Sequence, residues 1–459
     1  MPMNARLIAF LLFLCGSAGL VSTSQAQVIE FRSTIDAAQE PNSSSTSTAT
    51  GTAILLYDMT ANTFDLFVTL NNVTNTITLS HIHEAAAGVN GPVVTNLGSE
   101  AVYTRSGSTV TGAFRGVVHG GSKLTLLRNG AYLNFHSAQF TGGEIRGQLI
   151  AQPKRLTAII TPSQEVAASP VVSGAFGAAV MSYNPGTNRM NLQITLFNFT
   201  NTLAASHFHE APAGVNGPVV TNLGGAAAYS VNRPYITQTF NNLDYGTADP
   251  IRLLTGGAYL NFHSNVHGGG EIRGQVRASE EAVPMSRLIN ASVRGFAGTG
   301  NQVLIAGLGV TGNEPVAVRI VGRGPSLAAY GVQGALADPA ISLFNGAGAV
   351  MATNDNHTLV ASPTTPSLDA KESVLDVILP PGGYSIVISG VGATTGIALV
   401  ESFELRNGSS ANIVAVDDLT LAMSDRPSST SVASVSPSSA AFVPEFCVAP
   451  VTVVRSATQ

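Results

Sequence analysis

The chain has 459 residues, of which 44% are hydrophobic and 11% charged, and its formal net charge is −5. Globular proteins carry roughly 25% charged residues, so this chain is poor in charge but has ample apolar side chains for several cores. The composition excludes a chain that is disordered throughout. The few, scattered basic residues argue against a nucleic-acid-binding protein, and two cysteines cannot form a disulfide scaffold.

Residues 1–26 have the pattern of a secretory signal peptide. Arg6 precedes an apolar stretch, residues 7–14, that is too short to cross a membrane. Small residues at Ser24 and Ala26 favour cleavage after Ala26, and a lipidated Cys15 is the weaker alternative. No later segment has the length and hydrophobicity of a membrane span. The sequence therefore predicts a secreted or cell-surface protein.

The region after this peptide contains one unit twice. Three segments return almost unchanged: residues 81–97 as 207–223, residues 130–137 as 257–264, and residues 143–148 as 270–275. A Gln-Glu pair opens each copy, at residues 39–40 and 164–165. The offset stays between 125 and 127 residues. This long period predicts two whole domains, residues 27–152 and 153–279, and not a short solenoid repeat.

Apolar and polar residues alternate in both copies. The apolar positions are Phe64, Leu66, Val68 and Leu70 in the first copy, and Met190, Leu192, Ile194 and Leu196 in the second. A period of two places one face of a strand in a core and the other toward solvent. Turn-forming residues precede both runs. The pattern predicts an all-β fold, with antiparallel sandwiches or barrels.

Four ordered motifs make the repeat recognisable. The Gln-Glu opening, His-x-His-Glu-x-x-x-Gly-x-Asn-Gly-Pro, Tyr-Leu-Asn-Phe-His and Gly-Glu-Ile-Arg-Gly-Gln together resemble the CHRD domain, named from chordin. The resemblance covers residues 29–150 and 157–277. It implies an immunoglobulin-like or dismutase-like β-sandwich outside the cytoplasm. In chordin the module belongs to an extracellular protein that binds growth factors, whereas for bacterial copies the family implies little about a ligand.

The repeat does not extend into residues 286–408. Alternating apolar residues again predict a β-sandwich, with one helical turn at residues 325–330 between a proline and Gly331. The run from Asp338 to Asn356, followed by a Pro-Gly-Gly-Tyr strand, resembles pre-peptidase C-terminal modules, which are non-catalytic β-sandwiches. Residues 409–459 are rich in Ser, Ala, Val and Pro, which predicts a flexible low-complexity tail.

Six of the nine histidines occupy equivalent positions in the two copies: His81, His83 and His136, then His207, His209 and His263. Residues i and i+2 of a strand share a face and lie about 6.6 Å apart, so their imidazoles can converge on one metal ion. Imidazole ligands without thiolates favour copper(II) or zinc. The alternative is that these histidines hydrogen-bond the loop of residues 85–92 and hold it over the sheet.

The histidine pattern also resembles the copper half of copper/zinc superoxide dismutases. By position, that resemblance implies that the six histidines are copper ligands and that Arg146 and Arg273 steer an anion. Glu84 and Glu210 are expected to be partners of a loop or of the ligating imidazoles. The bridging histidine of the dismutases has no repeated counterpart, because His119 has no equivalent histidine in the second copy.

The remaining motifs give weaker indications of a binding or catalytic site. The oxygen-bearing side chains Asp338, Asn354–Asn356, Asp369 and Glu372 either bind calcium or, more simply, form turns. No Ser or Cys nucleophile has a triad around it, so dismutase-like activity is the one enzymatic alternative. The sequence favours an exported, non-enzymatic protein that binds an extracellular protein, glycan or matrix ligand. The second hypothesis is a copper- or zinc-binding protein with one three-histidine site in each repeated domain, which would allow redox activity.

Overall fold

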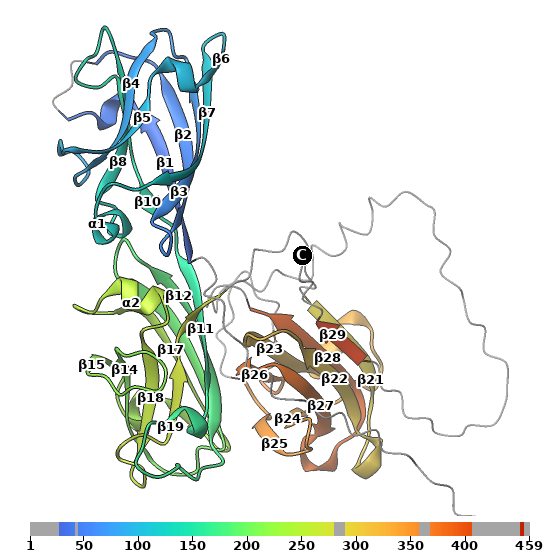
Figure 1. Ribbon diagram of the computed structural model, residues 1–459. Helices are drawn as coiled ribbons and strands as arrows, with labels where there is room; N and C mark the ends of the chain where they lie inside the picture. The colour runs from blue at the N-terminus through green and yellow to red at the C-terminus, as the bar shows by residue number, and fades with distance from the viewer. Residues whose placement is uncertain (1–26, 42–44, 280–289, 358–367, 406–449, 454–459) are drawn as a thin grey trace, which may run out of the picture.

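The computed structural model describes residues 27–41, 45–279, 290–357, 368–405 and 450–453. The predicted signal peptide and most of the predicted tail lie outside the described residues. Three β-rich domains follow one another along the chain. Figure 1 shows the first domain above the second, and the third domain beside the second. The predicted all-β class is confirmed, since the described helices are at most six residues long.

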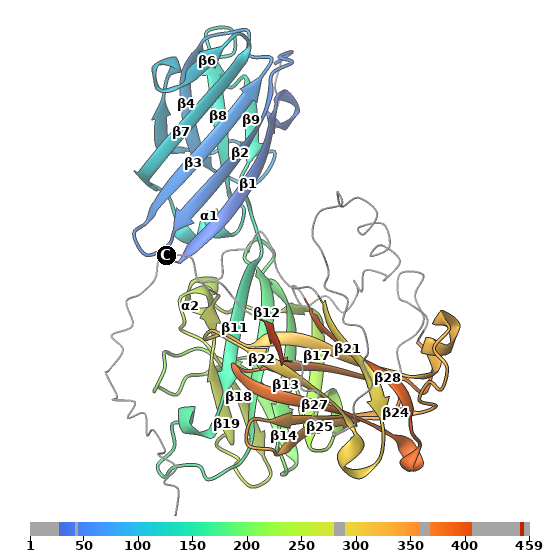
Figure 2. The ribbon, with the colours of Figure 1, turned by 90° about the vertical axis from the view of Figure 1, so that its right-hand side faces the viewer.

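The first domain is one antiparallel sheet that closes over a core, with strand order β5-β4-β8-β9-β1-β2-β3-β7-β6 and β10 beside β1. β1 joins the two halves, because it pairs with β2 along its length and with β9 at Asp36 and Arg146. The apolar residues predicted to face inward on β3 are at most 3% exposed. Figure 2 shows β1, β2, β3 and β7 side by side on one face.

The elements of the first domain are β1 (Val28–Asp36), η1 (Ala37–Gln39), β2 (Thr50–Asp58), β3 (Thr63–Asn71), β4 (Ile77–Glu84), β5 (Val93–Gly98), η2 (Glu100–Val102), β6 (Thr104–Ser106), β7 (Thr109–Val118), α1 (Lys123–Leu127), β8 (Ala131–Ser137), β9 (Ile145–Gln148) and β10 (Ile150–Ala151).

The second domain repeats this plan as two sheets, ordered β16-β17-β13-β12-β11-β20 and β15-β14-β18-β19. An isolated bridge between Thr161 and Arg273 takes the place of the β1–β9 pairing. The elements are β11 (Lys154–Ile160), η3 (Pro162–Gln164), β12 (Phe176–Asn184), β13 (Arg189–Phe197), β14 (Leu203–His209), β15 (Val219–Asn222), η4 (Ala226–Ala228), β16 (Ser230–Asn232), β17 (Tyr235–Asp244), α2 (Pro250–Leu254), β18 (Tyr259–Ser264), β19 (Ile272–Gln275) and β20 (Arg277–Ala278).

The third domain also has two sheets, ordered β21-β28-β23-β26 and β25-β24-β27-β22-β29. Its elements are β21 (Asn290–Ala297), η5 (Gly300–Gln302), β22 (Leu304–Val310), β23 (Val316–Arg323), η6 (Pro325–Tyr330), β24 (Pro339–Asn345), β25 (Val350–Asn354), β26 (Ser373–Leu379), β27 (Gly382–Gly390), η7 (Val391–Ala393), β28 (Gly396–Glu404) and β29 (Pro450–Val453). The predicted helical turn is confirmed as η6, which ends at Gly331 in the left-handed region. β29 belongs to the predicted tail and pairs in parallel with β22.

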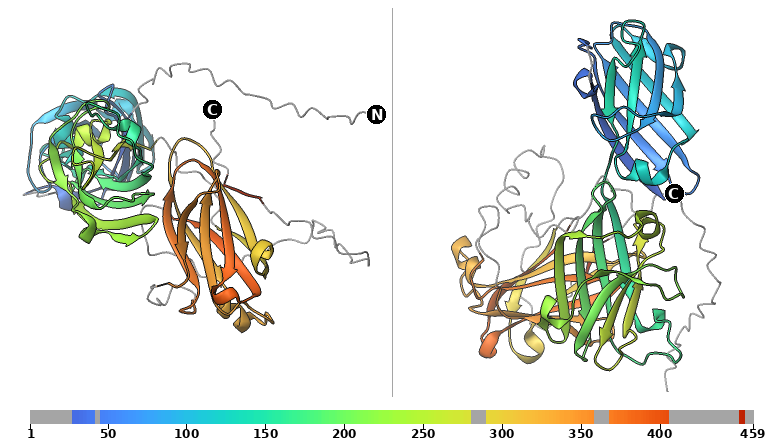
Figure 3. Two further views of the ribbon diagram at one scale, coloured as in Figure 1. Left: turned by 90° about the horizontal axis from the view of Figure 1, so that it is seen from below. Right: turned by 90° about the vertical axis from the view of Figure 1, so that its left-hand side faces the viewer.

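The third domain packs against the outer face of the larger sheet of the second domain. Ala178 and Val180 form an apolar cluster with Ala317 and Ile378, and the Ile378 N–H donates to Thr195 Oγ1 at 3.0 Å. Figure 3 shows this side-by-side arrangement in both views. Within the described parts of the chain, no helix has the length and hydrophobicity needed to cross a lipid bilayer.

Candidate metal centres

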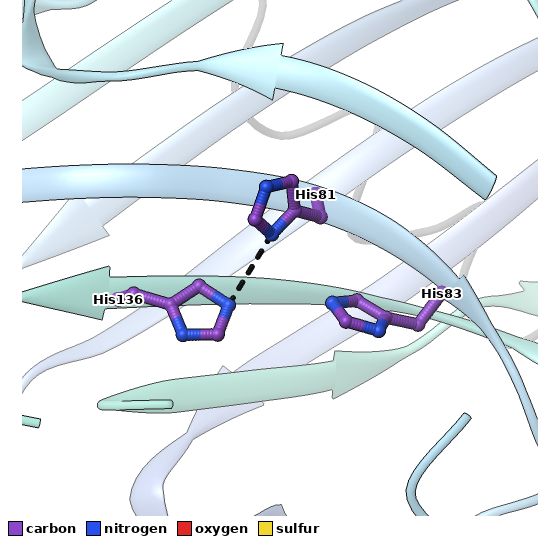
Figure 4. Close-up of side chains that lie close together, drawn as sticks. All are labelled: His81, His83 and His136. Atoms are coloured by element: carbon purple, nitrogen blue, oxygen red, sulfur yellow. Dashed lines mark hydrogen bonds between the residues drawn. The ribbon is translucent and has the colours of Figure 1, made fainter. Parts of the chain in front are cut away.

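The first histidine group comes from two neighbouring strands. His81 and His83 lie on β4, and His136 lies on β8, which pairs with β4. Ile82 between the first two points into the core and is fully buried, so the imidazoles project from the opposite face. One nitrogen of each ring lies within 4.8 Å of a nitrogen of the other two. Figure 4 shows His83 and His136 on either side of a gap, with His81 above it.

Main-chain carbonyl groups decide which ring nitrogens are free. His83 Nδ1 lies 2.9 Å from the Gly91 oxygen, and His136 Nδ1 lies 3.0 Å from the Thr141 oxygen. A carbonyl oxygen only accepts hydrogen bonds, so each Nδ1 carries the proton and each Nε2 presents a lone pair. His136 Nε2 lies 3.3 Å from His81 Nδ1. The unprotonated Nε2 atoms of His83 and His136 thus face His81, whose Nδ1 can donate to His136 Nε2 when no metal is bound.

The second domain repeats this arrangement. His209 Nδ1 and His263 Nδ1 lie 2.9 Å and 3.0 Å from the carbonyl oxygens of Gly217 and Gly268. The remaining nitrogens of the group, His207 Nδ1, His209 Nε2 and His263 Nε2, are buried and have no hydrogen-bond partner among the described residues. One unsatisfied buried polar atom costs about 1–3 kcal/mol. Three such atoms within 4.8 Å of one another fit a bound metal ion.

Burial keeps these imidazoles in the form that binds metal. It lowers the pKa of His81, His83 and His136 below the ordinary histidine value, and the neighbouring imidazoles lower the pKa of His81 further. The same cause lowers the pKa of His207 and His209. Neutral imidazole is the metal-binding form, so protons compete weakly with a metal ion at neutral pH.

A comparison with protein families agrees with the repeat. The family model of the CHRD domain matches residues 31–149 and 156–276, which together make up more than half of the chain. The chain belongs to the CHRD family. No curated protein matches the chain. The third domain lies outside the matched residues, so its resemblance to pre-peptidase C-terminal modules stays a prediction.

Arg146 and Arg273 of the two CHRD domains do not face solvent. Arg146 is 1% exposed, and it donates to the carbonyl oxygens of Val89 at 2.9 Å and Ala86 at 3.0 Å. Arg273 donates in the same way to Val215 and Pro212. This placement argues against the anion-steering role that the dismutase resemblance implied, because each guanidinium is buried and holds a loop of its own domain. We call residues 85–92 and 211–218 the cover loops.

An aromatic ring links each arginine to the histidine group. The Arg146 guanidinium carbon lies 3.3 Å from the centre of the Tyr132 ring, and the same ring stacks on His83 at 4.9 Å. The Gly91 N–H donates to the Tyr132 hydroxyl at 3.1 Å. Tyr259 repeats these contacts with Arg273, His209 and Gly217. His83 therefore holds the cover loop, as the structural alternative expected, while its Nε2 stays available to a metal ion.

Glu84 and Glu210 are loop partners and not ligands. Glu84 Oε1 accepts the N–H of Ser122 at 2.5 Å and lies 3.6 Å from His119. Glu210 accepts the N–H of Asp249 at 2.8 Å. Each carboxylate ties the end of a histidine-bearing strand to the start of α1 or α2. Tyr245 lies at the position of the second domain that His119 occupies in the first, and its hydroxyl group contacts Glu210. A tyrosine therefore replaces the histidine at this position.

The oxygen-rich turns of the third domain are engaged in protein contacts. Glu372 accepts the N–H groups of Gly324 and Ser326 at 3.1 Å and 3.0 Å, and Asn354 accepts the N–H of Val374 at 3.2 Å. These bonds favour the turn interpretation over calcium binding. The two histidine groups are the only sets of three converging metal-ligand side chains in the part of the chain that the structure describes.

The Gln-Glu pair places a buried carboxyl group beside each site, which the sequence did not reveal. Glu40 Oε1 and Asn134 Oδ1 are buried acceptors without a partner among the described residues. A side chain at Gly143, whose φ is 134°, would collide with both of them. Burial raises the pKa of Glu40 to about 7, although Arg146 opposes this change. A protonated Glu40 can donate to Asn134, which satisfies both groups. Glu165 and Asn261 form the equivalent pair, in which Glu165 Oε1 and Asn261 Oδ1 lack a partner and Asn261 Nδ2 donates to Glu165 Oε2 at 3.5 Å.

We expect Glu40 and Glu165 to stabilise the fold more at low pH than at high pH. Their pKa is about 7 in the folded chain and 4.5 ordinarily, so the folded state keeps a proton that the unfolded state loses. The resulting stabilisation is complete below about pH 4.5 and is lost as the pH rises through about 7.

Burial lowers the pKa of five of the six grouped histidines, and these five act in the opposite direction. The comparison is therefore between the wild type and a Glu40→Gln, Glu165→Gln variant, which stays neutral at every pH. The midpoint of thermal unfolding should fall more for the wild type between about pH 5 and about pH 8. Equal pH dependence of both proteins would show that the two carboxyl groups are already ionised in the folded chain.

Proposed function

We propose that this CHRD protein binds one copper(II) or zinc ion in each CHRD domain. The ligands are His81, His83 and His136 in the first domain, and His207, His209 and His263 in the second. The observation that carries the proposal is the orientation of the imidazoles. Main-chain carbonyl groups fix the tautomers of two rings per site, so that lone pairs, and not N–H groups, point toward the third ring. A hydrogen bond from the other ring N–H to a main-chain carbonyl oxygen is typical of histidines that bind metal.

The proposed sites have an incomplete set of protein ligands. Zinc and copper(II) commonly take four or more ligands, so three imidazoles leave room for an exogenous one. Zinc would supply a Lewis acid at that position, and copper would supply one-electron chemistry. The side chains around the site orient the ligands: Tyr132 packs on His83, and Arg146 holds the cover loop that carries Gly91.

Export belongs to the same proposal. The signal-peptide pattern of residues 1–26 supports a secreted or cell-surface location. Binding of an extracellular ligand by the β-scaffold, the function that the sequence alone favoured, is kept as a second candidate. It is supported by a cleft between the second and third domains.

The test is metal loading of the mature chain. Protein stripped with a chelator is incubated with copper(II) or zinc, desalted and analysed for its metal content. We expect two equivalents per chain, one for each histidine group. Since the ion binds only the folded state, a free concentration of about 100 times the dissociation constant should stabilise that state by about 2.7 kcal/mol.

A His357→Ala variant is the control, because it removes a histidine of the third domain that lies outside both groups. It should still bind two equivalents. A wild-type chain that retains no copper or zinc after desalting, and whose unfolding midpoint does not change with either ion, would refute the proposal.

A further inference from the structure

A cleft of about 230 Å³ lies between the second CHRD domain and the third domain. Strands β13, β16 and β17 form one wall, and strands β23 and β26 form the other. Figure 3 (left) shows the two domains meeting along these sheets. None of the six histidines of the proposed metal sites lines the cleft. Whatever binds here is thus independent of the metal proposal.

The wall from the CHRD domain is a row of hydroxyl groups. Ser230, Thr237 and Thr195 lie directly opposite one another across three adjacent strands, and Thr239 lies opposite Gln193. Opposed side chains of antiparallel strands are about 4.5–5.5 Å apart at Cβ. Thr195 already accepts a hydrogen bond from the Ile378 N–H. The hydroxyl groups of Ser230, Thr237 and Thr239 make no hydrogen bond within the described residues.

The wall from the third domain combines an apolar strip with one carboxylate. Leu405, Ala317 and Ile378 contribute the strip. Leu405 is half-buried, whereas Ala317 and Ile378 are at most 3% exposed because they pack on Ala178 and Val180. Asp376 is 41% exposed at its side chain. Both of its oxygens accept hydrogen bonds from Arg319 at 2.6 Å. Its charge is therefore compensated, while further lone pairs remain able to accept hydrogen bonds.

These walls select the class of ligand. An anionic ligand would find no cation to pair with, because neither lysine nor arginine is among the lining residues. The nearby Arg319 is already paired with Asp376. A purely apolar ligand would cut the hydroxyl row off from water without replacing its hydrogen bonds, which is costly. A sugar ring suits both walls, because it carries hydroxyl groups around its edge and C–H groups on its faces. The volume is below the roughly 300–1,000 Å³ of pockets for drug-sized ligands, so the cleft has room for about one sugar unit.

We infer that this cleft binds a neutral saccharide unit, either as a free sugar or at the end of a glycan chain. Thr237 and Thr239 donate and accept hydrogen bonds at the edge of the sugar, and the half-buried Leu405 packs against its C–H face.

The first CHRD domain offers a matched control. Thr104, Thr111 and Thr69 repeat the row across β6, β7 and β3. Phe67 and Ala113 are paired where Gln193 and Thr239 are paired in the second domain, and the Arg115 guanidinium lies over Phe67 at 4.5 Å. The first domain therefore has the same row of hydroxyl groups, but Phe67 and Ala113 lie next to it in place of Gln193 and Thr239.

The experiment uses the full mature chain after chelator treatment, which keeps it independent of the metal sites. Saturation-transfer NMR is recorded with methyl glycosides of neutral hexoses and of N-acetylhexosamines, and sedimentation assays use insoluble polysaccharides. We expect at least one glycoside or polysaccharide to bind. A Thr237→Val, Thr239→Val variant should bind it at least about fivefold more weakly, since each lost hydrogen bond costs about 0.5–1.5 kcal/mol.

The Thr111→Val variant should bind like the wild type. Binding of methyl glycosides would show that a single sugar unit suffices, and binding of polysaccharide alone, weakened by the double substitution, would show that the ligand is part of a glycan chain. The inference is overturned if no probe binds, or if the double variant binds as well as Thr111→Val. Equal unfolding midpoints of the two variants would show that a difference in binding does not come from misfolding.

Discussion

The His81→Ala variant should bind one copper(II) or zinc ion per chain where the wild type binds two. The substitution removes one of three converging ligands from the first domain and leaves the group of the second domain complete. Replacing a group that merely orients a metal-bound histidine costs about 10- to 100-fold in affinity. Loss of a ligand itself should exceed this range. Metal content after desalting and titration calorimetry both measure the change.

His81 also separates the metal hypothesis from the structural one. The His81 ring is hydrogen-bonded to His136, whereas His83 and His136 each also bond a main-chain carbonyl group. His81 is half-buried and makes this one hydrogen bond, so the metal-free His81→Ala protein should lose no more than about 1 kcal/mol of stability. A loss of stability without a loss of metal would indicate that the ring has a structural role.

The controls for this prediction come from the same two sheets. His207→Ala should remove the other ion, and the double variant should bind none. Leu79→Ala changes an exposed neighbour, directly opposite His136 on β4, and should still bind two ions. Two equivalents bound by the double histidine variant would place the ions elsewhere on the chain and contradict the proposed ligand sets.

The sequence was sufficient to predict the strands and the face on which the histidines lie. The period of two on β3 and β13 reflects burial of one face of a strand, and this local rule holds wherever a sheet covers a core. The spacing of His81 and His83 follows the same rule. The pairing of β4 with β8, which brings His136 to them, depends on contacts between distant segments, and alternation alone does not specify such partners.

The roles of Arg146 and Glu40 were not predictable in the same way. Arg146 binds the main-chain carbonyl oxygens of Ala86 and Val89. Every residue type has such an oxygen, so the sequence does not reveal which residues accept these hydrogen bonds. Glu40 is buried because the chain after η1 passes beside Asn134 and Gly143. A signal was present, since the Gln-Glu pair and the asparagine of Tyr-Leu-Asn-Phe-His recur in both copies. The repetition singled out the glutamate and the asparagine, but it did not show that the two side chains lie next to each other.

Replacing Arg146 with methionine should destabilise the first CHRD domain by about 3 kcal/mol. The guanidinium is 1% exposed and donates to two carbonyl oxygens and to Gln148 Oε1. Methionine has a similar length but no donor, so these buried acceptors lose their partners at about 1–3 kcal/mol each, less what water recovers. Thermal unfolding measures the loss, and hydrogen exchange of residues 85–92 should become faster.

The effect should reach the metal site through the cover loop. The Gly91 carbonyl oxygen accepts a hydrogen bond from His83 Nδ1–H. A loosened loop therefore no longer fixes the tautomer that presents Nε2, and the metal affinity of the first site should fall by about 10- to 100-fold. Arg115→Met is the matched control, since Arg115 forms an ion pair with Asp65 in which its side chain is 67% exposed. Such a pair contributes about 0–1 kcal/mol. Equal losses of stability in the two variants, with unchanged metal affinity, would mean that the cover loop holds its position without the buried arginine.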